Sequence, residues 1–458
     1  MTARDDQTAR HGDTARAYEA ALGYLFSATD YEKMRRVRYN ADTFSLDRMR
    51  RLLAALGDPH RRLRAVHVAG TKGKGSTAAM VHRLAVATGL RTGLYTSPHL
   101  VDIRERICVD DSLIAPDALA ALIRRARPHV DRMRAEGDAP TFFEIFTALA
   151  LDHFVRERVD LAVAEVGLGG RLDATNVLRP EVSVITAISL DHTAQLGTTL
   201  AEIAGEKAGI VKRGVPVVSQ PQPEGAGRVI DRACREAGAS LTVVGRDVTY
   251  AWSPAEQAGR PGGLLTVQTP TGTYADLFLP LMGEHQAVNA ATALAAAEQV
   301  PVLAARLTPE GAREALARLD WPGRMQYVPG SPAVLLDGAH NRASMERLLE
   351  AVAVHFPERR TAVVFAAAAD KDVDGMLEVL ARREPWAAIV FTRTTHPRAA
   401  EPEDLVRRYG ALGEADAATA GTVAEALGGA GEVVGADGLV VVCGSLYLVG
   451  EAMGSFDL

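Results

Sequence analysis

The sequence has few cysteines and no excess of positive charge, and each shortage excludes a class of protein. Only three cysteines occur in 458 residues: Cys108, Cys234 and Cys443. Because they are far apart, they indicate neither a disulfide framework nor a metal-ligand cluster, and they fit a reducing cytoplasm. The net charge of −6 provides no overall basic field that would recruit nucleic acid.

Long apolar segments are also missing. No apolar run approaches the ~18 residues that a membrane helix needs, and the polar N-terminal stretch lacks the apolar centre of a signal peptide. We therefore expect a cytoplasmic protein without a membrane partner, whose first dozen residues form a mobile tail. The composition, 47% hydrophobic and 24% charged, is that of a globular protein, and the length predicts two domains.

Short β-branched runs alternate with helical patterns along most of the chain. This alternation predicts an α/β fold with a mostly parallel sheet and helices on both faces. The expected strands include residues 64–70, 159–167, 182–188 and 215–219, and the expected helices include residues 74–87, 285–298 and 309–319. Residues 264–281 differ, because they predict a hairpin that turns near Thr271 and Gly272, a small antiparallel addition.

The WPGR stretch at residues 321–324 interrupts this pattern, and a second series of strands and helices follows it. Because Pro-Gly punctuates a chain, we place a domain boundary there. Residues 1–320 would form the first domain, and residues 321–458 a smaller α/β domain. Within the second domain, the glycine-rich residues 428–438 are expected to form a surface loop.

The stretch AGTKGKGSTAAMV, residues 69–81, is similar to a phosphate-binding loop but departs from the consensus motif. The P-loop rule requires a glycine, four residues, and then Gly-Lys-Ser/Thr. Here Val68 stands in place of the first glycine, and Gly75 separates Lys74 from Ser76. The context still fits the motif, because a predicted strand precedes the loop and a predicted helix follows it.

The residues of this loop suit phosphate. Its glycines let successive backbone N–H groups point inward, and the helix N-terminus adds partial positive charge. Lys74 supplies a cation for the β- and γ-phosphates, Lys72 supplies a second one, and the Ser76 hydroxyl suits Mg²⁺. The alternative is a tight strand-to-helix turn with exposed lysines.

Three residues beyond the loop are further candidates. Glu165 ends a predicted strand, where parallel sheets bind their ligands and where a carboxylate suits Mg²⁺. His192, beside Asp191, is a candidate metal ligand or phosphate contact, although a lone histidine is usually packed or exposed. Lys207 on a predicted helix is, by itself, typical of a solvated face. The GLGG stretch at residues 167–170 lacks the GxGxxG register, which disfavours a dinucleotide site.

Polar turns follow three predicted strands in the second half of the chain. They are DGAHN, with Asp337 and His340, then ADKD at residues 369–372, and CGS, with Ser445. Together they suggest one face directed at a ligand. Taken singly, each is equally an ordinary helix cap.

Ten motifs in this order resemble one family. They are AGTKGKGS, YTSPHL, PTFFE, EVGLGGRLDATN, LDHTAQLG, EKAGI, PGR, DGAHN, DKD and CGS. The set resembles folylpolyglutamate synthase, including its bifunctional dihydrofolate synthase form, within the Mur-ligase superfamily, over residues 17 to 453. The resemblance implies a Mur-ligase-like P-loop ATPase domain, followed by a Rossmann-like glutamate-ligase domain.

The resemblance also implies the reaction. In this family the γ-phosphate of ATP passes to a folate carboxylate, and the amine of L-glutamate attacks the resulting acyl phosphate, which gives an amide, ADP and phosphate. ATP is thus a co-substrate, and two Mg²⁺ ions are expected. A carboxylate is a poor electrophile, and its phosphorylation needs positioning and charge neutralisation more than a protein nucleophile.

The residue roles are carried over position by position. The implied ATP-binding residues are Gly70, Thr71, Lys72, Gly73, Lys74, Gly75, Ser76, Thr77, Asn289, Arg324 and Asp337. The implied metal ligands are Ser76, Ser97, Glu165, His192 and Lys207, the last after carbamylation. The implied catalytic residues are Lys74, Lys207 and His192, and the implied substrate-binding residues are Ser97, Asp173, His340 and Ser445. Lys72 replaces the asparagine common at its position, so its role stays open.

Other functions stay open at this point. A peptidoglycan precursor ligase would be expected to carry a UDP-binding domain before the loop, which starts only about 70 residues into the chain. A nucleotide-hydrolysing switch would need a partner or base-recognition element, and no NKxD-like motif occurs. A non-catalytic folate-binding module would leave the joint presence of Lys74, Glu165 and His192 unexplained. We expect a monomer acting on small molecules, with or without dihydrofolate synthase activity.

Overall fold

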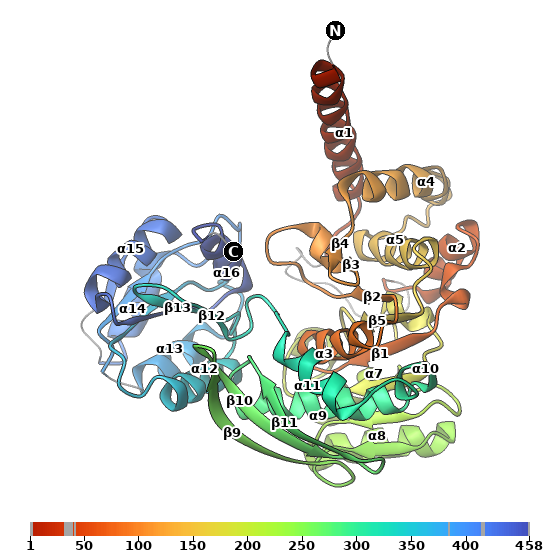
Figure 1. Cartoon of the computed structure of the whole chain (residues 1–458). Helices are drawn as coiled ribbons and strands as arrows, with labels where there is room; N and C mark the ends of the chain where they lie inside the picture. Colours follow the sequence, from red (N-terminus) through yellow and green to blue (C-terminus); the bar gives the residue numbers. More distant parts are fainter. Residues whose placement is uncertain (1–2, 32–39, 41–42, 383–384, 414–416, 457–458) are drawn as a thin grey trace.

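The protein folds into two lobes joined by a single connection (Figure 1). The structure, a computed structural model, describes residues 3–31, 40, 43–382, 385–413 and 417–456, with side chains from Thr14 onward. The N-terminal lobe contains an eight-stranded and a three-stranded sheet, and the C-terminal lobe contains a six-stranded sheet. This is the two-domain α/β architecture that the alternating pattern predicts.

The eight-stranded sheet has the order β4-β3-β2-β5-β1-β6-β7-β8. Its strands are β1 (Ala65–Ala69), β2 (Thr92–Tyr95), β3 (Ile107–Val109), β4 (Ser112–Leu113), β5 (Leu161–Glu165), β6 (Val182–Ile185), β7 (Val217–Ser219) and β8 (Leu241–Val243). Strands β2, β5, β1, β6, β7 and β8 pair in parallel, whereas β3 runs antiparallel to β2 and β4. The prediction of a mostly parallel sheet is confirmed.

Helices cover both faces of this sheet because its central strands are apolar on both sides. Val66 and Val68 of β1 pack into one core with the helices α3 (Lys74–Ala87), α9 (Glu284–Glu298) and α11 (Pro309–Ala317). Ala65 faces a second core, built with α2 (Leu46–Ala55), α4 (Pro116–Ala135) and α5 (Phe142–Arg156). The short α6 (Thr193–Leu196), α7 (Leu200–Ala208), α8 (Glu224–Ala237) and α10 (Pro301–Ala304) complete the lobe.

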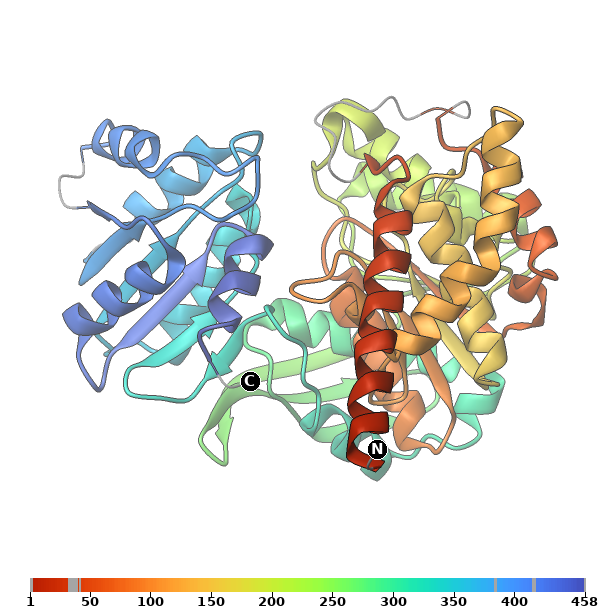
Figure 2. The same ribbon diagram turned by 90° about the horizontal axis from the view of Figure 1, so that it is seen from above.

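The first dozen residues, expected to be a mobile tail, lie within helix α1 (Ala3–Phe26), apart from Met1 and Thr2, which are outside the described residues. The second half of α1 packs beside α4 (Figure 2). Ala21 and Leu25 are buried in the core that α4 and α5 share, and the Tyr24 hydroxyl donates a hydrogen bond to Asp131 Oδ1 at 2.7 Å. Tertiary packing of one apolar face thus overrides the polar composition of this stretch.

The predicted hairpin is confirmed, and the structure adds a strand to it. Strand β10 (Arg260–Gln268) pairs antiparallel with β11 (Thr273–Leu279), and β9 (Thr249–Gln257) pairs antiparallel with β10. The turn closes where the Thr269 N–H donates to the Gly272 carbonyl oxygen at 2.9 Å. Strand β9 was not predicted, since most of its residues are at least partly exposed and give no apolar alternation.

The six-stranded sheet has the order β12-β13-β17-β14-β15-β16, and only β12 is antiparallel to its neighbour. Its strands are β12 (Gln326–Val328), β13 (Ala333–Leu336), β14 (Thr361–Phe365), β15 (Ala388–Phe391), β16 (Ala417–Thr419) and β17 (Leu439–Cys443). Its helices are α12 (Arg342–His355), α13 (Val373–Ala381), α14 (Pro402–Gly410), α15 (Val423–Val434) and α16 (Leu446–Met453). Apolar cores lie on both faces of the sheet, as in a Rossmann-like domain.

The expected surface loop at residues 428–438 is wrong for most of its length. Helix α15 continues to Val434, because Ala426, Ala430 and Val434 are buried against the β-sheet. Burial of this face outweighs the low helix propensity of the glycines. Only residues after Val434 form the turn that leads into β17.

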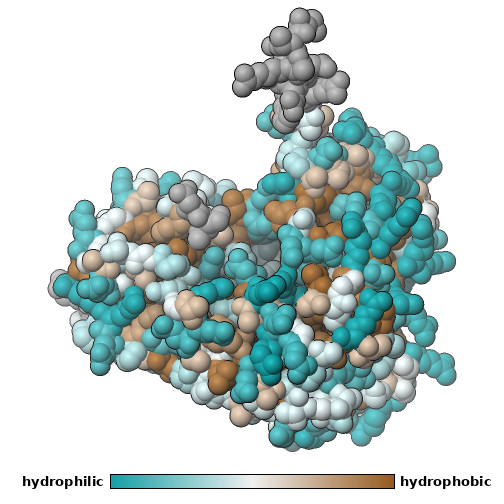
Figure 3. Space-filling model, viewed as in Figure 1, coloured by the Kyte–Doolittle hydropathy of each residue, from teal (hydrophilic) through white to brown (hydrophobic). Residues whose placement is uncertain are grey.

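The two lobes contact each other around Leu100, which lies between β2 and β3. The carbonyl oxygen of Leu100 is so close to Gly450 that a Cβ there would lie 2.4 Å from it. Beyond this contact the molecular surface is notched between the lobes (Figure 3). Within the described part of the chain, no helix is long and apolar enough to cross a membrane.

Candidate active site at the carboxyl edge of the first sheet

The phosphate-binding loop connects β1 to α3 and is fixed to the neighbouring strand. The N–H groups of Thr71 and Lys72 both donate to the Ala187 carbonyl oxygen, at 2.9 and 3.1 Å. Gly70 has φ +149°, and a Cβ there would lie 1.8 Å from the Thr186 hydroxyl. The loop thus curls into position only with glycine at residue 70.

Helix α3 begins at Lys74, after Gly73 in the left-handed conformation with φ +87°. No side chain caps this helix N-terminus. Its first N–H groups therefore remain available to an anion, with the partial positive charge of the helix behind them. The loop predicted from the sequence thus has the structure that phosphate binding requires.

Glu165 is the acidic residue nearest to this helix start. It ends β5, between β1 and β2, and is only 4% exposed. Its Oε2 accepts a hydrogen bond from the Ser97 N–H at 3.1 Å, and its Oε1 lies 4.0 Å from Lys74 Nζ. Burial raises the pKa of Glu165, and the positive charge of Lys74 opposes that rise. A buried carboxylate in this position needs a cation beside it.

Lys207 approaches the loop from α7. Its Nζ donates a hydrogen bond to the Gly70 carbonyl oxygen at 2.7 Å, and the residue is 4% exposed. Burial lowers the pKa of Lys207 to about 7, with a further contribution from the charge of Lys74. The solvated position that a helical lysine usually takes is therefore excluded, and a neutral amine is available near neutral pH.

Lys72 forms an ion pair with Asp191. Its Nζ donates to Asp191 Oδ2 at 2.9 Å, and the side chains are 18% and 14% exposed. Burial would raise the pKa of Asp191, but Lys72 and His192 hold it below its ordinary value. The pair fixes the loop of residues 69–76 to the turn that carries His192. Asp191 is thus a site residue that the sequence indicated only as a neighbour of His192.

His192 lies at the start of α6 with a left-handed backbone, φ 50°. The His192 side chain is 49% exposed, so its burial is only partial. Partial burial lowers the pKa of His192, with Asp191 opposing and Lys371 contributing. The imidazole is therefore neutral at pH 7, which is the form that can bind a metal ion. The charges of Lys74 and Lys207 also act on it, which places it near both.

Asn289 supports the loop from α9. A Cβ on Gly73 would lie 2.4 Å from Asn289 Oδ1, so the loop backbone passes directly over this amide. Its Oδ1 accepts from Gln220 Nε2 at 2.7 Å, and its Nδ2 donates to Gln286 Oε1 at 2.9 Å. Gln220 and Gln286 fix the orientation of the amide and had no signal in the sequence beyond being polar.

Arg324 and Asp337 lie where the connection enters the C-terminal lobe. Asp337 Oδ2 accepts from the Met325 N–H and Oδ1 from the Ala339 N–H, both at 2.8 Å. Burial raises the pKa of Asp337, whereas the positive charge of Arg324 lowers it. The same arginine also lowers the pKa of Glu165 in the other lobe, so its charge acts on a carboxylate of each lobe.

His340 and Ser445 follow two neighbouring strands of the C-terminal lobe, β13 and β17. His340 Nδ1 lies 2.8 Å from the Gly338 carbonyl oxygen. Burial lowers the pKa of His340 to about 3, and the charges of Lys72 and Lys371 add to this, so His340 lies within electrostatic range of the loop of the other lobe. Ser445 Oγ accepts from the Tyr447 N–H at 3.2 Å and caps α16.

Asp173 is held by its own turn. Its Oδ1 accepts from the Thr175 N–H and its Oδ2 from the Leu168 N–H, both at 2.9 Å. The turn continues as a single 3-10 helix at Ala174–Val177, which the sequence did not predict. Asp173 is 3% exposed, and its carboxylate stabilises this turn by accepting hydrogen bonds from the backbone.

The predicted residues therefore fall into two groups across the notch. Those on the N-terminal lobe surround the loop: Gly70, Thr71, Lys72, Gly73, Lys74, Gly75, Ser76, Thr77, Ser97, Glu165, His192, Lys207 and Asn289. Trp321 also contacts this loop, since a Cβ on Gly75 would lie 3.1 Å from its ring. Its sequence context, WPGR, indicated only a turn.

The donor set fits Mg²⁺ but offers few carboxylates. Glu165 and Ser76 are each 4% exposed, and a Cβ on the intervening loop residue Gly75 would lie 3.4 Å from Glu165 Oε2. Within the described residues, no group of three or more His, Cys, Asp or Glu side chains could hold a metal ion by itself. Mg²⁺ commonly keeps waters and nucleotide oxygens and takes only one or two carboxylates, so this set suits it only with a nucleotide present.

Comparison with known proteins identifies the family of this chain. Residues 68–297 match the Mur ligase middle domain, and residues 323–446 match the Mur ligase glutamate ligase domain. A dihydrofolate synthase/folylpolyglutamate synthase of Bacillus subtilis is 37% identical over 411 residues, covering 89% of this chain and 93% of the relative. A probable bifunctional folylpolyglutamate synthase/dihydropteroate synthase of Haloferax volcanii is 39% identical, and the chain spans 50% of its length.

A solved structure shares the whole fold. The folylpolyglutamate synthase of Mycobacterium tuberculosis, complexed with ADP and AMPPCP, superposes with a TM-score of 0.87 at 34% identity. The match covers 97% of this chain and 99% of that one. The chain therefore belongs to the Mur ligase family, in its folylpolyglutamate synthase and dihydrofolate synthase branch, and is an ATP-dependent ligase.

Proposed function

We propose that this ligase joins L-glutamate to the carboxylate of a folate through an acyl phosphate, releasing ADP and phosphate. One observation carries the proposal: Lys74, Glu165 and Lys207 converge on an uncapped helix N-terminus at the carboxyl edge of a parallel sheet. Such an edge is where α/β proteins bind their ligands. The names of the relatives supply the substrate class.

In the first step a folate carboxylate oxygen bonds to the γ-phosphorus of ATP. The bond between that phosphorus and the β–γ bridging oxygen breaks, and ADP leaves with the electron pair. Backbone N–H groups of residues 70–77 would hold the phosphates, and Lys74 would neutralise the charge on the transferring group.

In the second step the neutral amine of L-glutamate attacks the acyl carbon. The carbon–oxygen bond to phosphate breaks, phosphate leaves, and the nitrogen loses a proton to give the amide. His340 and Ser445 on the facing lobe would line the glutamate side, and Asp173 the pterin side. Because the acyl phosphate and glutamate would be held together across the notch, the bimolecular step becomes effectively unimolecular.

Asn289, Arg324 and Asp337 would position the nucleotide. Arg324 lies on the connection between the lobes, near residue 321, where we place the boundary between a domain of residues 1–320 and one of residues 321–458. Its charge acts on a carboxylate of each lobe. Closure of the lobes would therefore bring this arginine to the phosphates.

We propose two Mg²⁺ sites at the same edge. Ser76, Ser97 and Glu165 would hold the first, and Glu165, His192 and a carbamylated Lys207 the second. Bound there, the ions would neutralise phosphate charge and align the γ-phosphate. The neutral Nζ of Lys207 would bond to the carbon of CO₂ and lose a proton. The resulting carbamate offers the anionic oxygens that Mg²⁺ prefers.

The test is an assay of ADP formation with glutamate and one of three acceptors: dihydropteroate, tetrahydrofolate or a UDP-muramoyl peptide. We expect ADP only when glutamate and a pterin acceptor are both present. Turnover with dihydropteroate would add dihydrofolate synthase activity. ADP formation that requires the UDP-muramoyl peptide would replace the proposal with a Mur-type ligase on another carboxylate. Release of phosphate without any acceptor would favour a nucleotide hydrolase. We propose a cytoplasmic monomer.

A further inference from the structure

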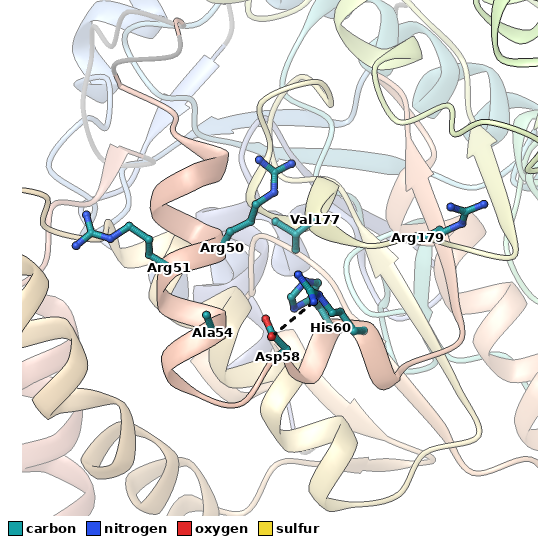
Figure 4. A pocket seen from close by; sticks show the side chains of 8 residues that line it. Arg50, Arg51, Ala54, Asp58, His60, Val177 and Arg179 are labelled. Carbon is teal, nitrogen blue, oxygen red and sulfur yellow. Dashed lines mark ion pairs between the residues drawn. The ribbon is translucent and has the colours of Figure 1, made fainter.

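A cavity of about 530 Å³ lies on the N-terminal lobe, away from the phosphate-binding loop (Figure 4). It is lined by Arg50, Arg51, Ala54, Asp58, His60, Arg61, Val177 and Arg179. These residues come from α2, from the 3-10 helix η2 (Pro59–Arg62) and from the chain around η4 (Ala174–Val177). Four arginines thus share the lining with one carboxylate.

The topology places this cavity at the opposite edge of the sheet from the active site. Strands β1 and β6 pair in parallel, and the phosphate-binding loop follows the carboxyl end of β1. Arg61 precedes β1 and Arg179 precedes β6, so both lie at the amino ends of these strands. A strand of five residues separates the two edges by roughly 15 Å. In Figure 1, α2 likewise lies on the side of this lobe remote from the C-terminal lobe.

The positive charge of the cavity is only partly compensated. Arg51 pairs with Glu136 and Asp138, at 2.5 and 2.7 Å, and extends away from Val177 (Figure 4). Arg50 pairs with Asp47 at 2.7 Å. Arg61 Nη1 lies 3.9 Å from Asp58 Oδ2, a long ion pair.

Arg179 has no hydrogen bond or ion pair with any described residue. Arg179 is exposed and lines the cavity with Arg50 and Arg61, and its side chain is directed away from His60 and Asp58 (Figure 4). Arg50 and Arg61 each have a carboxylate nearby, so Arg179 is the charge of the lining that no described carboxylate balances. An anion bound in the cavity would balance it.

His60 forms part of the cavity wall while being only 8% exposed. Its Nδ1 is buried behind that wall and has no hydrogen-bond partner within the described part of the protein. Burial lowers the pKa of His60, Asp58 opposes this, and Arg61 and Arg50 lower it further. Both arginines are thus close enough to this imidazole to disfavour its protonation.

We infer that the cavity is a binding site, separate from the active site, for a small anion with two or more phosphate or carboxylate groups. Arg61 and Arg179 would each form a bidentate pair with such a group, because the planar guanidinium matches its geometry. Arg50 would add charge, and His60 would form part of the wall. The cavity is several times larger than pyrophosphate or citrate, so either anion would fit together with bound water.

The experiment is isothermal titration of the full chain with pyrophosphate and, separately, with citrate, in saturating ADP. ADP occupies the nucleotide site, so heat from that site is excluded. We expect one saturable site per chain, with an affinity that falls as salt is raised. The double variant Arg61→Ala/Arg179→Ala should bind about a hundredfold more weakly, at about tenfold for each lost charge-assisted pair.

Two control variants distinguish this site from the nucleotide site and from a general loss of surface charge. Arg232→Ala removes one exposed arginine from α8 and should leave the affinity within about twofold of the wild type. Lys74→Ala should leave anion binding unchanged, because the loop is at the other edge. Arg61 and Arg179 are exposed, so the double variant should keep the melting temperature and the ligase turnover of the wild type.

Each outcome of the titration supports or overturns the site. Saturable binding of pyrophosphate alone would support a phosphate ligand, and binding of citrate alone a carboxylate ligand. The inference is overturned if neither probe binds saturably, if the double variant binds as the wild type does, or if Lys74→Ala abolishes binding. Because binding is measured without turnover, these results stand apart from the fate of the proposed reaction.

Discussion

The polar residues at the strand ends of the two lobes are used differently. In the C-terminal lobe they serve their own backbone: Asp337 accepts from two N–H groups, and Ser445 caps a helix. In the N-terminal lobe, Lys207 and Glu165 are buried charged groups that lack a close partner of opposite charge. Lys207 donates to a neutral carbonyl oxygen, and Glu165 has a lysine at 4.0 Å.

This difference indicates where the chemistry takes place. Groups satisfied by their own backbone position what they touch, whereas buried charges without full partners are kept ready for a ligand. Six of the 51 basic residues are lysines, and three of them, Lys72, Lys74 and Lys207, lie at the loop. At the loop, lysine provides a compact amine that can be deprotonated, which arginine cannot.

The largest effect is expected from Lys74→Ala, which removes the cation at the helix start. Because this charge acts on the transferring phosphoryl group, we expect a loss of ~3 kcal/mol or more in transition-state stabilisation, about a hundredfold or more in kcat. Because Glu165 loses the cation beside it, a modest fall in melting temperature is also expected, and circular dichroism should show that the variant remains folded. A turnover number equal to that of the wild type would show that Lys74 does not stabilise the transferring phosphoryl group.

Lys207→Ala should be nearly inactive, because the second metal site loses its carbamate. Acetate or propionate should restore part of the activity by filling the gap with a carboxylate, while Lys207→Met measures the loss of the amine with more of its volume kept. The direct check is a ¹³C signal from the wild type after exposure to ¹³CO₂. An active, Mg²⁺-loaded enzyme with an unmodified Nζ would contradict the proposal.

The pH dependence of the same lysine gives a second check. Since burial lowers the pKa of Lys207 to about 7, the neutral amine dominates only above that pH. Carbamate formation, and activity with it, should therefore rise as the pH increases through about 7 and fall below it. A ¹³C-carbamate signal that is independent of pH from 6 to 8 would speak against this assignment.

An intermediate effect is expected from breaking the pair of Lys72 with Asp191. Lys72→Met leaves a buried carboxylate without its cation and should raise the KM for ATP about tenfold, the cost of ~1–2 kcal/mol of coupling. Asp191→Asn should have a similar effect, and the double variant should cost less than the product of the two. Effects that simply multiply would show that the pair does not act as a unit.

The smallest effect should come from Ser445→Ala in the C-terminal lobe. The variant loses the N-cap of α16, which typically costs ~1 kcal/mol of stability. We also expect a few-fold rise in the KM for glutamate with little change in kcat. Thr in place of Ser445 keeps the cap and serves as the matched control. A large loss of kcat would mean that the two lobes do not divide positioning from chemistry as described.

The elements that the sequence predicted are those with a strong local signal. Strand β1, the loop and α3 combine a buried apolar run, glycines at positive φ and a helix start. These local signals all predict the same strand–loop–helix unit. Strand β9 and helices α1 and α15 have no comparable local signals in their own residues. Their positions depend on partners far along the chain, such as Asp131 for Tyr24 of α1.

The site was predicted in the same uneven way. Lys74 and Glu165 were found because the motif and the strand end both indicate chemistry. The burial of Lys207 and the pairing of Lys72 with Asp191 could not be read from local sequence, since each partner lies more than 100 residues away. Gln220, Gln286 and Trp321 act through contacts alone, and nothing in their neighbours distinguishes them.

The central claim is that the folate carboxylate is phosphorylated before glutamate attacks it. The direct measurement uses an acceptor with both oxygens of the reacting carboxylate replaced by ¹⁸O, together with ATP and glutamate. In the acyl-phosphate route the carboxylate oxygen that bonds to phosphorus leaves with it, so each turnover should yield one ¹⁸O in the released phosphate. Phosphate free of ¹⁸O, formed while the amide accumulates, would contradict the account.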